Sequence, residues 1–326
     1  MTIIDPRLLS GAAIASTAAA VFPGSAPSPE QEEKAQSVIV GDCLAVLRAM
    51  ASGSIDAAVT SPPYNIGVAY RSYDDRMPRD IYLAWMDESA KQIARVLAED
   101  GALFLNLSST GTDPWIAADV AGRFRQHLTL QNRITWVKSI SVDGETRGHF
   151  KPINSCRFLN RTNEEIFHFT KRGDAVIDRL AIGVPYQDKS NVSRWKQGRD
   201  RRCGGNSWHI PYETIRSKAS RHNHPAAFPV GVPLRCLGMH GRKGLVLDPF
   251  LGSGTTLVAA RMAGWNGIGI EIDEVYANTA RRRIAEVSRG REPCPGRCGK
   301  AWSMAAGRLS LPTSWTEAFR RLGRDT

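Results

Sequence analysis

Cysteines and long apolar runs are scarce in this sequence. Its six cysteines are scattered over 326 residues without a disulfide-framework spacing, which favours a reducing compartment. The most apolar stretch, residues 8–22, is too short to cross a bilayer comfortably and is interrupted by Ser and Gly. We therefore expect a cytoplasmic protein with no membrane partner, and an N-terminal arm and linker over residues 1–36. Cys294 and Cys298 form a C-x3-C pair, but no second pair or close histidine follows, so we predict no metal site.

Acidic residues are in deficit. The 32 Asp and Glu against 43 Lys and Arg leave a net charge of +11. Such an excess favours a polyanionic partner such as nucleic acid, although a generally basic proteome produces it too. The excess gathers in residues 171–221, which hold 12 Lys or Arg against 5 Asp or Glu. This segment has no clear periodicity and is interrupted by glycines and prolines, so we expect an irregular insert there.

Outside this segment, short apolar runs alternate with amphipathic ones. Strands are expected at 37–43, 55–61, 102–108, 128–138, 164–171, 244–250 and 267–273. Helices are expected at 43–50, 79–101, 255–264 and 275–287. This alternation predicts a mostly parallel α/β sheet with right-handed crossovers. We divide it into halves at 37–170 and 222–288, separated by the insert at 171–221 and followed by a basic tail at 289–326.

A proline corner follows the strand at 55–61. In "TSPPYN" two prolines fix two φ angles and remove two backbone N–H donors, so Ser61, Pro62, Pro63 and Tyr64 form a stiff bend with free carbonyls. A stiff bend at the end of a buried strand is a good place to hold a ligand. The alternative is a proline turn that is merely packed by the tyrosine.

A glycine-rich turn, "LDPFLGSGTT" at 247–256, lies where a strand gives way to a helix. Gly252 and Gly254 allow the backbone to turn tightly and approach a ligand closely. Glu271 ends the next strand, where a carboxylate can accept hydrogen bonds from ribose hydroxyls. No G-K-[ST] lysine is present, and Asp248 would repel a pyrophosphate. The pattern therefore favours a positively charged or zwitterionic nucleoside such as S-adenosylmethionine.

Together these motifs resemble the beta group of site-specific DNA amino methyltransferases, in which the catalytic motif precedes the cofactor motif. "GDCLAVL", "GALFLN", "NEEIFHFTK" and "HPAAFP" extend the resemblance over residues 37–288. The resemblance implies a single Rossmann-like domain, with a mixed seven-stranded sheet, helices on both faces and a permuted motif order. It also implies S-adenosyl-L-methionine as the cofactor, bound by the half at 222–288, and duplex DNA as the partner, which would place the protein at the bacterial nucleoid.

The resemblance also implies roles for individual residues. The catalytic corner would be formed by Ser61, Pro62, Pro63 and Tyr64. The cofactor would be bound by Asp42 near the adenine, Glu271 at the ribose, and Asp248, Phe250, Gly252, Gly254, Thr255 and Thr256 around the turn. His224 and Phe228 would close over the methionine moiety. The segment 171–221 would recognise the target. Within it, the basic cluster itself can neutralise several phosphates, so we expect DNA contact by Arg194, Lys196, Arg199, Arg201 and Arg202; the alternative is a solvated basic loop.

The chemistry of an exocyclic amine explains the corner. Its lone pair is delocalised into the ring, so the enzyme must hold the nitrogen in a more pyramidal state. The carbonyl of Pro62 or Pro63 can accept one N–H and the Ser61 hydroxyl the other, already oriented by the rigid bend. The Tyr64 ring offers a face on which a flipped-out base can stack.

Three questions stay open from sequence alone. Many adenine-directed relatives carry Asp where this chain has Ser61, which favours cytosine N4 over adenine N6 as the acceptor. Cytosine C5 is disfavoured because no Pro-Cys pair lies at the corner. A non-catalytic DNA-binding regulator, or methylation of RNA or free bases, is a further alternative. A cognate restriction endonuclease and a homodimer are further expectations for partners.

Overall fold

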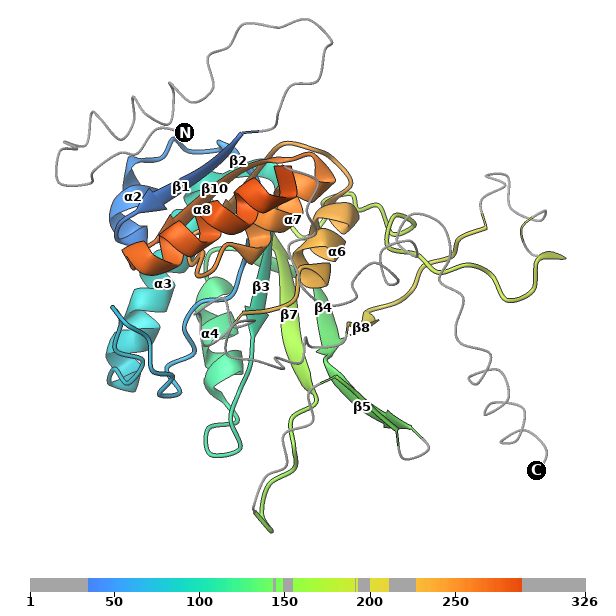
Figure 1. The fold of residues 1–326 in the computed structure, drawn as a ribbon, viewed down its shortest axis with the longest axis horizontal. Coiled ribbons are helices and arrows are strands. Elements are labelled where there is room, and N and C mark those ends of the chain that lie inside the picture. Colours follow the sequence, from blue (N-terminus) through green and yellow to red (C-terminus); the bar gives the residue numbers. More distant parts are fainter. Residues whose placement is uncertain are drawn as a thin grey trace, which may run out of the picture. The chain divides into compact units, whose positions relative to one another are not determined.

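The computed structural model describes residues 35–142, 145–148, 155–190, 192, 200–210 and 227–288 (Figure 1). Its strands are β1 (Gln36–Val40), β2 (Ile55–Thr60), β3 (Leu97–Leu107), β4 (Thr129–Val137), β5 (Ser139–Val142), β6 (Glu145–Gly148), β7 (Asn163–Thr170), β8 (Ser207–His209), β9 (Leu245–Asp248) and β10 (Asn266–Glu271). Its helices are α2 (Cys43–Ala49), α3 (Arg79–Val96), α4 (Ile116–Phe124), α6 (Gly231–His240), α7 (Thr255–Ala263) and α8 (Glu274–Ser288). Among the helices in these ranges, none has the length and apolar character of a membrane-spanning segment.

Eight strands form one mixed sheet in the order β1-β10-β9-β2-β3-β7-β4-β8. β7 is antiparallel to both of its neighbours, β3 and β4, whereas every other pair is parallel. The predicted mixed α/β sheet is confirmed. It has one strand more than the seven expected, because β8 comes from the segment that we assigned to an irregular insert and pairs with β4 through Trp208 and Trp136. Both indoles are almost fully buried.

Helices pack on both faces of the sheet. Leu103, Leu105 and Leu107 of β3 share one hydrophobic core with α2, α3 and α4. Side chains alternate along a strand, so Phe104 points to the opposite face, where it stacks on His168 at 4.7 Å. The helices α6, α7 and α8 pack against one another, apart from that core.

The boundary between α3 and β3 differs from the prediction. The helix expected over 79–101 ends at Val96, and Leu97 already pairs with Ile55 of β2. The register then shifts before Ala102, which makes a bulge that contains Gly101. A Cβ at Gly101 would lie 3.0 Å from the backbone of Ala98, so the bulge leaves little room for a side chain there. The helices α4 and α6 and the hairpin β5–β6 were not expected from the sequence either.

The described residues of 179–204, which are 179–190, 192 and 200–204, belong to a second compact unit, and the sheet with its helices belongs to the first. Within the second unit, Val184 and Arg202 form an isolated antiparallel bridge, and the Asp200 carboxylate accepts the Tyr186 N–H at 3.1 Å. This unit is narrower than the 171–221 segment expected for the insert, since residues 205–210 belong with the sheet. The other expected domain boundaries stay predictions, and residues 1–34 and 289–326 lie outside the described residues.

Candidate active site

One cavity of about 410 Å³ lies where β2, β3, β9 and β10 end. Parallel strands present their carboxyl ends at one edge of a sheet, which is the common ligand site of such folds. Both sequence motifs reach it although they are far apart in the chain. The cavity is lined by these predicted residues: Asp42, Ser61, Pro62, Pro63, Tyr64, Phe228, Asp248, Phe250, Gly252, Thr255 and Glu271.

Hydrogen bonds fix the proline corner on its inner side. The Tyr82 hydroxyl donates to the Pro63 carbonyl at 2.7 Å, and Thr60, just before the corner, donates its hydroxyl to Asp248 at 2.7 Å. The prediction that the Pro63 carbonyl has no intrachain partner is therefore wrong, because Tyr82 on α3 reaches it. The Pro62 carbonyl has no hydrogen-bond partner among the described residues, so it is the better acceptor for a ligand.

A carboxylate that the sequence did not single out organises the loop after Tyr64. Asp75 is only 1% exposed, and its two oxygens accept the backbone N–H groups of Asn65, Ile66 and Val68 at 2.8–3.0 Å. Asn65 has a left-handed φ of 57° and exchanges two hydrogen bonds with the backbone of Met77. These bonds make the loop behind the corner rigid.

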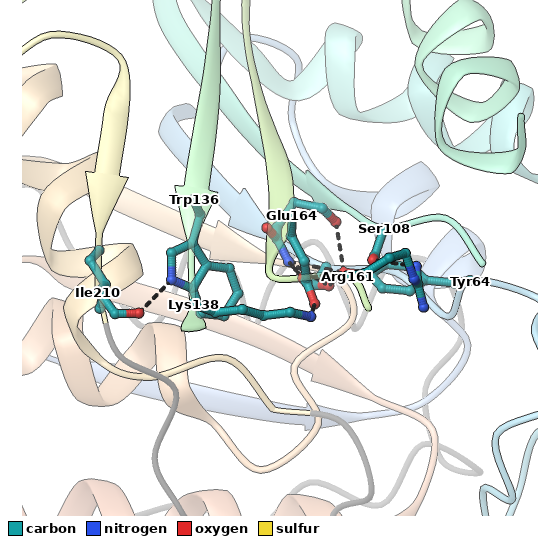
Figure 2. A network of polar contacts seen from close by, with 9 residues as sticks. Tyr64, Ser108, Trp136, Lys138, Arg161, Glu164 and Ile210 are labelled. Atoms are coloured by element: carbon teal, nitrogen blue, oxygen red, sulfur yellow. Dashed lines mark hydrogen bonds and ion pairs between the residues drawn. The ribbon is translucent and has the colours of Figure 1, made fainter. Parts of the chain in front are cut away.

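A polar network surrounds the Tyr64 hydroxyl (Figure 2). This hydroxyl shares a 2.7 Å hydrogen bond with Ser61 and accepts the Asn106 amide N–H at 2.9 Å. The same amide nitrogen donates to Glu164 at 2.8 Å, and the other oxygen of Glu164 accepts from Lys138 at 2.7 Å. Burial, followed by the negative charge of Glu164, raises the pKa of Tyr64 well above its usual value. Tyr64 is therefore a neutral phenol over the physiological range.

Carboxylates gather in another part of the lining, at the glycine-rich turn and the ends of β1 and β10. Asp42, Asp248, Glu271 and Asp273 all line the cavity there, whereas the lysine and arginine that line it, Lys138 and Arg161, lie with the Tyr64 network. Burial raises the pKa of Asp248 to about 6 and also raises that of Glu271. This part of the cavity therefore suits a cationic ligand.

Backbone N–H groups hold the Glu271 carboxylate in place. One carboxylate oxygen accepts the Gly252 N–H at 2.8 Å, and the other accepts the Asp273 N–H at 2.9 Å. Each oxygen has a further lone pair for a ligand hydroxyl. Asp42 has a structural task as well, since it caps α2 by accepting the Ala45 N–H at 2.8 Å.

Two predicted cofactor residues do not line the cavity. Gly254 has a φ of 84°, and a Cβ there would lie 2.6 Å from that of Ala280, so this glycine lets the turn pack on α8. The Thr256 hydroxyl donates to the Val59 carbonyl at 3.1 Å and holds α7 to β2. His224 lies outside the described residues.

Comparison with known proteins decides the family. A model of the N6/N4 type described as DNA methylase matches residues 55–282, more than half of the chain. The chain belongs to the DNA methylase family. The methylase is 29% identical over 256 residues to the type II methyltransferase M.ScaI of Streptomyces caespitosus, covering 75% of this chain and 79% of that one. It is 27% identical over 259 residues to the DNA adenine methyltransferase YhdJ of Escherichia coli, covering 77% and 83%.

Solved structures agree with this assignment. TTHA0409 from Thermus thermophilus, complexed with S-adenosyl-L-methionine, superposes on the methylase with a TM-score of 0.54 and 25% identity, over 80% of this chain and 95% of that one. The methylase is an S-adenosylmethionine-dependent DNA methyltransferase. The predicted family, cofactor and DNA substrate are thereby confirmed.

The cavity of the methylase fits this cofactor. Its carboxylates complement a ligand that carries a sulfonium and an ammonium group. Phe250 packs edge-on against Trp85 at 5.5 Å, and Trp85 stacks on Tyr73 at 5.6 Å, so aromatic faces border the same space. When bound, S-adenosylmethionine supplies an electrophilic methyl group.

Of the predicted DNA contacts, only Arg201 and Arg202 are described. The Arg201 guanidinium donates to the Gly183 carbonyl at 3.2 Å, and Arg202 joins the bridge to Val184. Arg194, Lys196 and Arg199 lie outside the described residues, so DNA contact by this cluster stays a prediction.

Sequence reasoning missed several polar residues of the site, among them Asp75, Asn106, Lys138 and Glu164. A signal existed for the last three, since each lies close to an end of an expected strand. Asn106 and Lys138 lie at the carboxyl ends of β3 and β4, and Glu164 lies at the start of the antiparallel β7. The reversal of β7 brings its first residues to the same edge of the sheet.

Proposed function

We propose that this methylase modifies the N4 amine of a cytosine, flipped out of a short duplex DNA sequence. The lining of one cavity by both the Ser61–Tyr64 corner and the glycine-rich turn carries the proposal. The choice of cytosine rests on Ser61, which puts a neutral hydroxyl where many adenine-directed relatives have a carboxylate. Ser61, Pro62 and Tyr64 are the proposed catalytic residues.

The corner holds the acceptor amine. The Pro62 carbonyl accepts one N–H and the Ser61 hydroxyl accepts the other, which disfavours delocalisation of the nitrogen lone pair into the ring. Pro63 contributes rigidity rather than an acceptor, because the Tyr82 hydroxyl already donates to its carbonyl. The Tyr64 ring stacks on the extruded base, and its hydroxyl is held by Ser61 and Asn106. The amine therefore meets acceptors that need no reorganisation.

The carboxylate side of the cavity holds the cofactor. Glu271 accepts the ribose hydroxyls, Asp42 lies near the adenine, and Asp248 faces the cationic groups. Phe250, Phe228, Gly252 and Thr255 complete the proposed cofactor surface, with His224 as a further predicted contact. Gly254 and Thr256 lie outside the cavity lining and hold the turn against α8 and β2.

Adenine N6 is the second candidate for the acceptor. The resemblance to YhdJ, a DNA adenine methyltransferase, favours it. A companion restriction endonuclease that cuts the same DNA sequence is proposed from the resemblance to M.ScaI, a type II enzyme.

The deciding experiment incubates the protein with duplex DNA and labelled S-adenosylmethionine, and identifies the methylated nucleoside by mass spectrometry. We expect N4-methylcytosine; N6-methyladenine alone would contradict the choice of base.

Ser61→Ala should lower the single-turnover rate of methyl transfer by about 100-fold. Ser54→Ala is the matched control, because the Ser54 hydroxyl only donates to the Ala51 carbonyl. Specific DNA binding without transfer would instead support a regulator.

A further inference from the structure

One wall of the cavity carries a partly buried ion pair. Lys138 and Glu164 approach to 2.7 Å, and their side chains are only 18% and 13% exposed. Figure 2 shows Lys138 extending from the end of β4 toward Glu164 at the start of β7. Both residues line the cavity together with Tyr64. An ion pair withdrawn from water costs desolvation energy, so its presence here calls for a functional explanation.

The pair is tied to the catalytic corner. The second oxygen of Glu164 accepts the Asn106 amide at 2.8 Å, and this amide also donates to the Tyr64 hydroxyl. Beside Lys138, the Trp136 indole is fixed by its hydrogen bond to the Ile210 carbonyl at 2.7 Å. The ammonium group of Lys138 is therefore held at a set position relative to the ring on which the base stacks.

The ammonium group of Lys138 has more N–H donors than its ion pair with Glu164 uses. A lysine offers three N–H donors, and Glu164 takes one of them. Within the described part of the chain, no other hydrogen bond reaches this nitrogen. Arg161 lines the same wall and donates to the Ser108 hydroxyl at 2.9 Å. This wall therefore offers positive donors and suits a ligand edge that carries acceptors.

Cytosine and adenine differ on the edge beside the amine. In cytosine, the N4 amine is followed by two acceptors, the ring nitrogen N3 and the carbonyl oxygen O2. In adenine, the N6 amine is followed by the acceptor N1 and then by an apolar C2–H. A flipped base is recognised through this edge. A buried cation that faces C2–H would lose water without gaining an acceptor.

We propose that Lys138, positioned by Glu164, donates to the N3 and O2 acceptors of the flipped cytosine and so selects cytosine over adenine. The inference rests on the proposed function and names the residue that sets the choice of base. Lys138 donates to N3 and O2, whereas Ser61 and Pro62 accept the N–H groups of the N4 amine. Glu164 is a positioning residue, because it acts through its hydrogen bonds with Lys138, Asn106 and the Tyr64 hydroxyl.

The test compares the protein with Lys138→Met on duplexes that carry cytosine or adenine at the target position. Methionine keeps the length of the stem but removes the donors. We expect kcat/KM for cytosine to fall roughly 10- to 100-fold, with no comparable loss for adenine, so that the cytosine preference collapses. Replacing the target by 2-thiocytosine, whose sulfur is a weaker acceptor, should slow the wild type and leave Lys138→Met little changed.

Lys171→Met is the matched control, because Lys171 also pairs with a glutamate, Glu99 at 3.0 Å, but does not line the cavity. The dissociation constant for S-adenosylmethionine should be unchanged in every variant. If Lys138→Met unfolds, the double variant Lys138→Met/Glu164→Gln removes both charges and should show the same loss of preference. If the wild type makes N4-methylcytosine and the variants keep its preference for cytosine over adenine, the role of Lys138 is overturned and the proposed function stands. N6-methyladenine from the wild type would overturn the proposed function.

Discussion

Asp248 is a buried carboxylate at the end of β9, with 1% of its surface exposed. The hydroxyl of Thr60 and the backbone N–H of Phe250 both donate to one of its oxygens. These bonds favour the charged form, but burial outweighs them and raises its pKa from 3.8 to about 6. The charged carboxylate therefore destabilises the fold, and a cationic ligand would offset this cost.

This shift predicts how stability depends on pH. Between about pH 4 and pH 6 the folded protein keeps a proton on Asp248 that the unfolded chain has lost, so the contribution of Asp248 to the free energy of unfolding falls as pH rises, by about 3 kcal/mol. Asp248→Asn cannot ionise and should not show this fall. Urea unfolding of both proteins between pH 4 and pH 7 measures the difference. Parallel curves would contradict the prediction.

At the scale of elements, the glycine-rich turn depends on the close approach of α8. Gly254 is the N-cap of α7 with a φ of 84°, and a Cβ there would lie 2.6 Å from that of Ala280. Neither the backbone nor the neighbouring helix leaves room for a side chain.

Gly254→Ala should therefore lower the free energy of unfolding by about 3 kcal/mol, from backbone strain and overpacking together. Gly122→Ala is the control, because Gly122 lies within α4 and a Cβ there meets nothing within 4 Å. That change should raise the free energy of unfolding by about 0.5–1 kcal/mol. Urea titration measures both, and equal effects would argue against the packing explanation.

The sequence predicts helices and strands better than it predicts which residues pair with one another in space. Periodicity found the strands around the cavity, and the prolines and glycines marked its two corners. It placed the end of α3 too late, because Leu97 and Ala98 continue the helical pattern while the pairing of Leu97 with Ile55 decides for strand. It missed β8 because Trp208 is buried by the neighbouring strand rather than by a pattern of its own. The pairing of Lys138 with Glu164 depends on the direction of β7, which local sequence does not encode.

At the scale of the whole molecule, the net charge of +11 bears on DNA affinity. Each phosphate contact releases counterions, so the logarithm of the binding constant falls with the logarithm of salt concentration by about 0.9 per contact. If Arg194, Lys196 and Arg199 contact phosphates, replacing all three by alanine should flatten this slope by about 2 to 3. Fluorescence anisotropy at several salt concentrations measures it.

Arg48→Ala is the control for this series. Arg48 lies on α2 and pairs with Glu88 at 3.1 Å. Its removal should leave the slope unchanged. An unchanged slope in the triple variant would mean that the cluster is only a solvated loop.

The first and last described strands along the chain are neighbours in space. β1 pairs with β10, and Arg281 of α8 donates to the Val38 carbonyl at 3.0 Å. The order in which the gene encodes the two halves is consequently of little importance to the fold. In a circularly permuted protein, α8 would be joined to β1 and the new chain ends would lie between β8 and α6. Every strand would keep its present neighbours in the sheet.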